Sequence, residues 1–203
     1  MAFLKKHSFK IAVLALCAVM GVYLLMTYVF KPQEPLPVLK AAPAFEMTSI
    51  EGEQVSLEST SGKARIVYFY FANCPDVCPP TTYLLSQVQE QLIKEDLLGS
   101  KVEMISITFD PERDTPDAIK AFAERTFVQL GKGWHFLRGD EEETLEIARE
   151  FGVGVTKDKE LNTFYHMNTI TLVDQEGQIR DWINGSDEEL TAEQIVAQLK
   201  RLL

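Results

Sequence analysis

A charge-free apolar segment near the N-terminus constrains this chain more than any other feature. Residues 11–30 (IAVLALCAVMGVYLLMTYVF) contain no charged side chain. At a rise of about 1.5 Å per residue, a helix of this length spans about 30 Å, which is the thickness of the hydrocarbon core of a bilayer. The segment therefore predicts a single transmembrane helix, and Cys17 within it is interpreted as a small apolar residue that faces lipid.

The residues around this segment predict its orientation. Lys5, Lys6 and Lys10 precede it, so the positive-inside rule keeps residues 1–10 in the cytoplasm and exports the rest of the chain. A cleaved signal peptide is the alternative, but its apolar region typically has only about 7–15 residues. We expect an uncleaved, single-pass anchor with the C-terminal domain on the extracytoplasmic side. The short basic N-terminus has no Arg-rich transit peptide, which favours a bacterial cell membrane over a mitochondrial one.

The charge of the exported part limits its partners. The chain has a formal net charge of −10, and no acidic residue precedes Glu34. The C-terminal part therefore carries the whole acidic excess. Such a surface repels phosphate backbones, so we expect no nucleic-acid partner. The sequence gives no indication of the oligomeric state.

The remaining chain divides into a linker and one domain. Residues 31–43 contain four prolines and predict an extended tether that leaves the membrane. Residues 44–203 have the length of a single domain with one core, about 160 residues. Because the second and third cysteines lie in this exported part, they face a compartment in which disulfides can form.

Short apolar strands alternate with amphipathic helices in this domain. The expected strands are a hairpin of Phe45–Ile50 with Gln54–Leu57, then Ile66–Ala72, Val102–Phe109, Trp134–Leu137, Thr169–Val173 and Gln178–Ile183. The expected helices run from the Pro79-Pro80 pair through Leu92, from Asp114 through about Leu130, from Asp140 to Phe151 and from Thr191 to Leu203. This order predicts an α/β fold, a thioredoxin-like mixed sheet flanked by helices, with an N-terminal β-hairpin.

A cysteine pair follows the expected strand Ile66–Ala72 and precedes a helix. Cys74 and Cys78 therefore lie at the carboxyl edge of the sheet, where ligands bind in open α/β folds. The nearby helix N-terminus stabilises thiolates. Because Pro79 disfavours helical geometry at the residue before it, we expect the pair on a loop. The CxxxC spacing alone leaves a metal site and a dithiol redox pair both open.

His166 shifts this balance toward a metal. It lies shortly before the strand Thr169–Val173, at a junction that in thioredoxin-like chains faces the cysteines and usually carries a proline, which is absent here. Two thiolates and one imidazole form a soft three-coordinate set suited to Cu(I), which can take Cu(II) with an added oxygen ligand. Zinc usually requires a fourth ligand, and the sequence offers no obvious residue for it.

Two acidic residues are weaker candidates at this site. Asp76 lies between the cysteines and could tune their field or supply an oxygen, or be a solvated loop residue. Asp110 lies at the end of the second buried strand and is the first residue of the DPERDTP sequence, where it could support the site or a docked partner, or form a turn with Pro111.

Three segments of the domain resemble a known family. FANCPDVCPPTT, ISITFDPERDTP and YHMNTITLVDQEGQI occur in the order seen in the Sco (SenC) family of cytochrome c oxidase assembly proteins, and the similarity extends from about residue 42 to the C-terminus. The resemblance implies that Cys74, Cys78 and His166 are copper ligands. It also implies that the partner is the dinuclear copper (CuA) site of cytochrome c oxidase subunit II.

The resemblance leaves the type of activity open. The family is described both as a copper metallochaperone and as a thiol-disulfide reductase that prepares the cysteines of the CuA site. The same three residues serve both roles. The alternative is an extracytoplasmic thiol-disulfide oxidoreductase that acts without metal, with Cys74 as the attacking thiolate. A copper or redox sensor without transfer chemistry is a third hypothesis.

Overall fold

The computed structural model describes residues 2–29 and 35–203 of the chain, which divides into two units, Met1–Glu34 and Pro35–Leu203. The first unit is helix α1 (Ala2–Leu24), continued by a π-helical turn over Leu25–Val29. Its stretch Phe9–Thr27 is long and apolar enough to cross a membrane, as the sequence predicts. The end of the expected anchor at residue 30, and residues 31–34 of the expected linker, lie outside the described residues.

The second unit is built on a mixed eight-stranded sheet with the order β1-β10-β9-β4-β5-β6-β2-β3. Its strands are β1 (Lys40–Ala41), β2 (Glu46–Ser49), β3 (Gln54–Ser56), β4 (Ala64–Tyr70), β5 (Val102–Thr108), β6 (Trp134–Arg138), β9 (Thr169–Val173) and β10 (Gln178–Asn184). A separate antiparallel hairpin is formed by β7 (Val155–Asp158) and β8 (Thr163–His166). The central strand β4 pairs parallel with β5 and antiparallel with β9.

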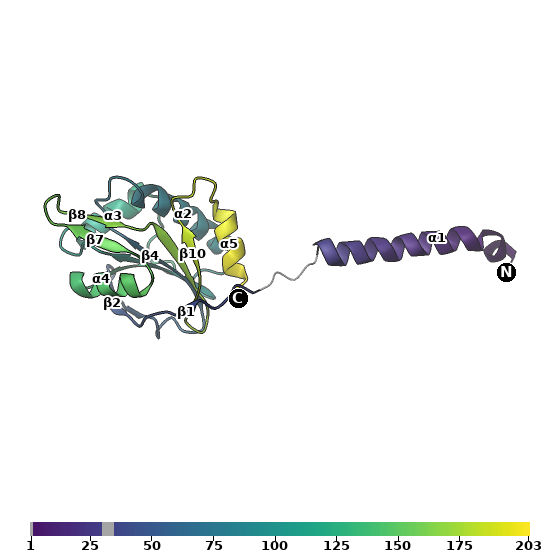
Figure 1. Cartoon of the computed structure of the whole chain (residues 1–203), viewed down its shortest axis with the longest axis horizontal. Coiled ribbons are helices and arrows are strands. Elements are labelled where there is room, and N and C mark those ends of the chain that lie inside the picture. Colours follow the sequence, from purple (N-terminus) through teal and green to yellow (C-terminus); the bar gives the residue numbers. More distant parts are fainter. Residues whose placement is uncertain (1, 30–34) are drawn as a thin grey trace. The chain divides into compact units, whose positions relative to one another are not determined.

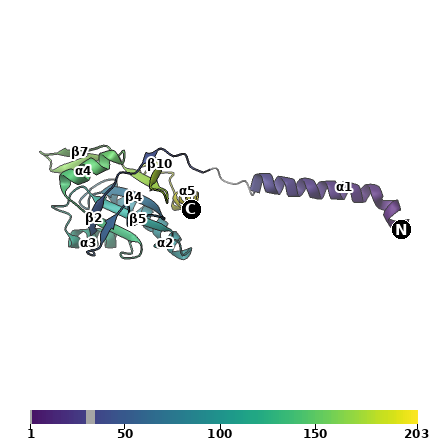
Figure 2. The same ribbon diagram turned by 90° about the horizontal axis from the view of Figure 1, so that it is seen from below.

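Helices cover both faces of this sheet. They are α2 (Cys78–Lys94), α3 (Pro116–Arg125), α4 (Glu141–Glu150) and α5 (Ala192–Lys200). The connections β4-α2-β5 and β5-α3-β6 cross in the same direction, and right-handed crossovers therefore place α2 and α3 on one face. Figures 1 and 2 show α4 on the opposite face, and α5 contacts α2. The expected thioredoxin-like mixed sheet flanked by helices, with its N-terminal hairpin, is confirmed.

Three strands in the middle of the sheet form the core. Every residue of β4, β5 and β9 is buried, as continuous apolar runs of strands covered on both faces require. The buried cluster also includes Cys74 and Cys78. The cysteines therefore pack against the buried core of the domain.

Arg65 is a charged residue inside this core, with only 1% of its surface exposed. Its guanidinium donates hydrogen bonds to Thr60 Oγ1 (2.9 Å), to the carbonyl oxygen of Asp174 (2.6 Å) and to that of Leu57 (3.1 Å). These bonds satisfy a buried charge that would otherwise be costly. Arg65 thereby joins β4 to the segment after β3 and to the turn between β9 and β10.

Helix α3 is shorter than expected, because it ends at Arg125 instead of about Leu130. Phe127 adopts a left-handed conformation with φ of 60°. The N–H of Phe127 donates to the carbonyl of Glu124 (3.2 Å), and that of Val128 donates to the carbonyl of Ala123 (2.9 Å). This pattern is a Schellman motif, in which glycine is the usual left-handed residue. A phenylalanine at that position gives the sequence no stop signal.

The start of α2 also differs from the expectation. Cys78 was expected on a loop, but it is the first residue of α2, and Val77 before it already has helical angles (φ −81°, ψ −27°). Pro79 and Pro80 are tolerated in the first turn because no intrahelical partner exists there for the N–H they lack. Cys74 remains on the loop, which begins after Tyr70.

Asp140 and Thr191 are N-caps that lie just outside their helices, and Thr191 forms a capping box with Gln194. The sequence expectation missed β1 and the β7–β8 hairpin. The hairpin matters for function, because His166 is its last residue.

Candidate metal centre

Cys74, Cys78 and His166 meet at one edge of the domain. Among the residues that the structure describes, they form a group of metal-ligating side chains whose donor atoms all lie within 4.8 Å of one another. The Cys78 Sγ lies 3.5 Å from His166 Nε2, and the Cys78 N–H donates to Cys74 Sγ at 3.5 Å. Cys74 comes from the loop after β4, Cys78 from the start of α2 and His166 from the end of β8, so folding brings distant segments together.

The loop that carries Cys74 is held at its start by two charged residues. The N–H of Ala72 donates to Asp114 Oδ2 (2.8 Å), and the Arg125 guanidinium donates to the carbonyl of the same residue. Asp114 is fully buried and also accepts a hydrogen bond from Thr108 at the end of β5. Burial raises the pKa of its carboxyl. The loop is thus fixed to the end of β5 and to α3.

His166 is oriented by its other ring nitrogen. Its Nδ1 lies 3.0 Å from the carbonyl oxygen of Met167, so Nδ1 carries the proton and donates it to that oxygen. Nε2 is then the ring nitrogen that faces the cysteines. The ring packs against Phe71 and Phe109, with centroid distances of 6.0 and 5.1 Å. The ring is therefore oriented so that Nε2 is the nitrogen available to a metal.

The two thiols differ in their acidity. The hydrogen bond from the Cys78 thiol, together with those from His166 and from the N–H groups of Asp76 and Cys78, lowers the pKa of Cys74 to about 4 against the opposing effect of burial. The hydrogen bond to Cys74 and complete burial raise the pKa of Cys78. Cys74 is also the more exposed sulfur, at 7% against 0%. Cys74 is thus a thiolate that accepts a hydrogen bond from the buried thiol of Cys78.

This donor set fits a soft metal ion. Two sulfurs and one imidazole nitrogen match Cu(I), whereas carboxylate oxygens would favour harder ions. Aromatic rings line the buried side of the group, and their apolar surface limits the access of water. The chemistry open to the site is metal binding and thiol–disulfide exchange.

The weaker candidates have other positions. Asp76 is exposed, and its backbone N–H, not its carboxylate, contacts Cys74. Asp110 is 3% exposed and its carboxylate pairs with Arg113, while its N–H donates to Thr108 Oγ1 at 3.0 Å. Asp110 thus lies in the turn between β5 and α3.

Several residues that shape the site were missed at the sequence level. Asp114 was interpreted only as part of a helix start, although its neighbours in the DPERDTP segment were singled out. Arg125 and Tyr68, whose hydroxyl interacts with the Cys78 thiol, gave no signal, because an arginine in a helix and a tyrosine in a strand are ordinary at the sequence level. Their positions depend on contacts between distant segments.

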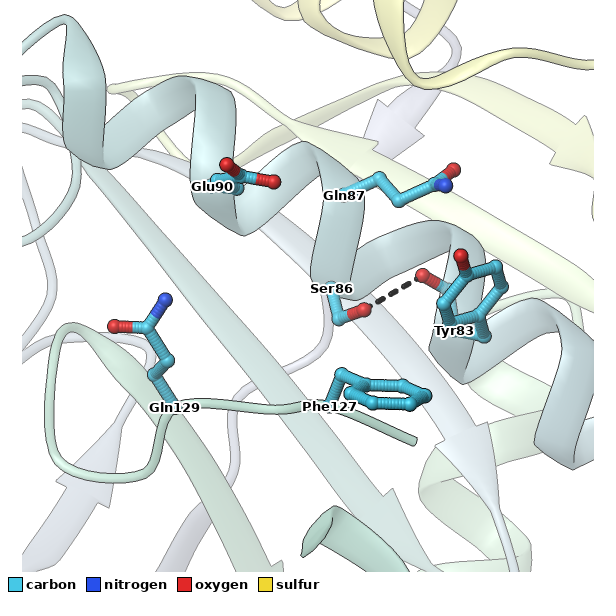
Figure 3. A pocket seen from close by; sticks show the side chains of 6 residues that line it. All are labelled: Tyr83, Ser86, Gln87, Glu90, Phe127 and Gln129. Atoms are coloured by element: carbon cyan, nitrogen blue, oxygen red, sulfur yellow. Dashed lines mark hydrogen bonds between the residues drawn. The ribbon is translucent and has the colours of Figure 1, made fainter. Parts of the chain in front are cut away.

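A shallow hollow on α2 lies outside this group of ligands. It has a volume of about 360 Å³ and is lined by Tyr83, Ser86, Gln87, Glu90, Phe127 and Gln129 (Figure 3). The rings of Tyr83 and Phe127 meet edge to face with centroids 5.7 Å apart. None of the lining residues carries a thiol or an imidazole, so the hollow contributes no ligand to the metal centre.

A family model and individual relatives both match the same family. The model of the SCO1/SenC family matches residues 34–203 of the chain. The SCO1 protein homolog of Bacillus subtilis is 30% identical over 158 residues, which cover 77% of this chain and 79% of that protein. Protein SCO2 of Saccharomyces cerevisiae mitochondria is 30% identical over 162 residues, which cover 77% of this chain and 52% of that protein.

Solved structures agree with this similarity. One of them is BsSco, a member of the Sco family of cytochrome c oxidase assembly proteins in which a disulfide switch is described. It superposes with a TM-score of 0.72 at 29% identity, and the match covers 84% of this chain and 98% of that one. Bradyrhizobium japonicum ScoI with copper bound gives a TM-score of 0.65 at 30% identity, covering 80% of this chain and 99% of that one.

Proposed function

The chain belongs to the SCO1/SenC family, and on this premise we propose that it binds copper through Cys74, Cys78 and His166 and acts in cytochrome c oxidase assembly. The convergence of three soft donor atoms within 4.8 Å carries the proposal. The copper-bound structure of a 30% identical relative supports it. The hydrogen bond of His166 Nδ1 to Met167 adds to this support, because it orients the ring with Nε2 toward Cys78, where that nitrogen can bind a metal.

The partner in this proposal is the CuA site of oxidase subunit II. A three-coordinate Cu(I) can accept a further thiolate from an incoming partner, which gives copper a route of transfer by ligand exchange. The Cys74 thiolate can also attack a disulfide of the CuA site to form a mixed disulfide, and Cys78 can then displace the partner's sulfur. This exchange would release both partner cysteines as thiols and leave Cys74 and Cys78 joined as a disulfide. The same pair of sulfurs therefore serves copper delivery, reduction of the partner, or both in sequence.

The proposal includes a membrane topology. Residues 1–10 are cytoplasmic, residues 11–30 form the single-pass anchor, residues 31–43 form the linker, and residues 44–203 form the copper-binding domain on the extracytoplasmic side. The apolar helix over Phe9–Thr27 and the lysines before the predicted anchor support this arrangement.

Replacement of His166 tests the ligand set. We expect His166→Ala in the full chain in detergent to lower the affinity for Cu(I) by at least about 100-fold, or about 2.7 kcal/mol, because the only nitrogen donor of the group is lost. Competition with a Cu(I) chelator measures the affinity. The matched control is His135→Ala, because His135 pairs with Glu103 (3.1 Å) on β5 and contributes nothing to the group. A His166→Ala protein with the affinity of the wild type would contradict the proposal.

The low pKa of Cys74 favours a second candidate, a thiol-disulfide oxidoreductase that acts without metal. Complementation of a deletion strain separates the roles. If added copper restores oxidase activity in cells that carry His166→Ala, delivery is supported, and restoration by a thiol reductant supports reduction of the partner. If His166→Ala reduces a protein disulfide at the wild-type rate without metal and sustains full oxidase activity, the second candidate replaces the first.

A further inference from the structure

The three proposed ligands belong to two separate segments that must be held in register. Cys78 begins α2, and His166 ends β8. Their donor atoms are 3.5 Å apart, although 88 positions separate them in the chain. Some other contact has to fix this spacing, because a metal site whose ligands sit on independent elements loses affinity when those elements shift.

Asn168 lies between these segments and contacts both. It is two residues after His166, and its Nδ2 donates to Thr81 Oγ1 at 2.9 Å. Thr81 is one helical turn after Cys78, at the buried start of α2. The same Nδ2 group donates to Ser186 Oγ at 3.0 Å. The amide therefore joins the histidine segment, the cysteine helix and the loop after β10.

The remaining atoms close this connection into a ring. Thr81 Oγ1 donates to the carbonyl of Gly185 (3.3 Å), and the N–H of Gly185 donates to the carbonyl of Asn168 (2.8 Å). A Cβ at Gly185 would come within 3.0 Å of the Asn168 amide, so the side chain packs directly on this backbone. Three hydrogen bonds thus connect Asn168, Thr81 and Gly185 in a closed ring.

Tyr68 anchors the ring to the core of the sheet. Its hydroxyl donates to Asn168 Oδ1 at 3.2 Å from the fully buried strand β4. The same hydroxyl also interacts with the Cys78 thiol. The amide oxygen and the buried sulfur thus share one rigid neighbour, which gives Asn168 a second connection to the cysteine side of the site.

We propose that Asn168 is a positioning residue that sets the distance between Cys78 and His166 through its hydrogen bonds to Thr81 and Tyr68. The inference rests on the proposed copper function. Asn168 touches neither the metal nor the substrate in this account. It acts by preventing α2 from sliding relative to the β8–β9 turn, so that both ligands already stand at binding distance before copper arrives.

The test compares Asn168→Ala with a matched asparagine in the same region. We expect Asn168→Ala in the full chain to lower the Cu(I) affinity by about 10-fold, in the range typical of residues that orient metal ligands, and to change the thiolate-to-Cu(II) charge-transfer spectrum. The control is Asn184→Ala, because Asn184 Oδ1 accepts from the Ser186 N–H at 3.0 Å in the same loop. Its affinity and spectrum should stay at wild-type values.

A second variant removes the other end of the connection. Thr81→Val keeps the shape of the side chain but loses its hydroxyl, and should reproduce the effect of Asn168→Ala on affinity. In the double variant the loss of Cu(I) binding free energy should be smaller than the sum of the losses in the two single variants, because both changes remove the same hydrogen bond. Thr81→Val also keeps the proposal falsifiable if Asn168→Ala does not fold.

The outcomes separate this inference from the proposed function. A wild-type chain that binds no copper would overturn both proposals. A wild-type chain that binds copper, with Asn168→Ala and Thr81→Val equal to it in affinity and spectrum, would overturn only the role of Asn168. An equal loss of affinity in Asn184→Ala would also overturn it, because the effect would then be general to the loop.

Discussion

Cys78→Ser should lower the Cu(I) affinity of the chain by about 1,000-fold or more, which corresponds to about 4 kcal/mol. Serine has nearly the shape of cysteine but offers a hard oxygen in place of a soft sulfur, and Cu(I) strongly prefers sulfur. Cys78 is fully buried and lies 3.5 Å from His166 Nε2, so a water molecule has little room to replace the lost ligand. Chelator competition on the full chain in detergent measures the change.

The natural control for this variant is the third cysteine. Cys17 is a free thiol in helix α1, outside the domain that carries the ligands. Cys17→Ser removes one sulfur from the chain and should leave the affinity unchanged. If Cys78→Ser and Cys17→Ser bound copper equally well, the metal would be held by a different set of ligands.

The largest expected effect on stability comes from Arg65→Met. The change removes the donor from three buried or half-buried oxygens, those of Thr60, Leu57 and Asp174. The carbonyl oxygens of Leu57 and Asp174 keep other donors, Thr60 Oγ1 and the Gly177 N–H, so the change removes only the bonds from the charged guanidinium. A hydrogen bond to a charged group contributes about 1.5–3 kcal/mol, so the free energy of unfolding should fall by about 3 kcal/mol. Methionine fills much of the space of the arginine stem, which separates the loss of hydrogen bonds from the creation of a cavity. Urea unfolding followed by fluorescence measures the difference.

An exposed cation provides the comparison for Arg65. Lys120 lies 3.9 Å from Asp117, and both side chains are largely exposed, so Lys120→Met should change the free energy of unfolding by less than about 0.5 kcal/mol. If Arg65→Met were as stable as Lys120→Met, the hydrogen bonds of the buried guanidinium would make no net contribution to the fold.

The sequence predicted the ligand region well because strand, loop and helix signals coincide there. The run before Cys74 is apolar and β-branched, and Pro79-Pro80 mark a helix start, so the position of the pair at the sheet edge follows from local patterns. The β7–β8 hairpin was missed because its strands are only four residues long and mostly half-buried or exposed, without a clear alternation. The strand that ends at His166 therefore left no periodic signal.

Other parts of the site depend on contacts that no local pattern encodes. Arg125 reads as the last turn of an ordinary helix, yet its guanidinium holds the carbonyl of Ala72 at the start of the cysteine loop. Arg65 precedes an apolar run and would be placed at the surface by composition, although it is buried. The structural role of such residues can be recognised only after the segments that they join have been placed in space.

X-ray absorption at the copper edge of the Cu(I)-loaded full chain tests the central claim most directly, because it counts the atoms bound to the metal. The account predicts two sulfur ligands and one nitrogen ligand, supplied by Cys74, Cys78 and His166. His166→Ala should lose the nitrogen and Cys78→Ser should lose one sulfur. A shell with fewer than two sulfurs in the wild-type chain, or one that is unchanged in both variants, would contradict the account.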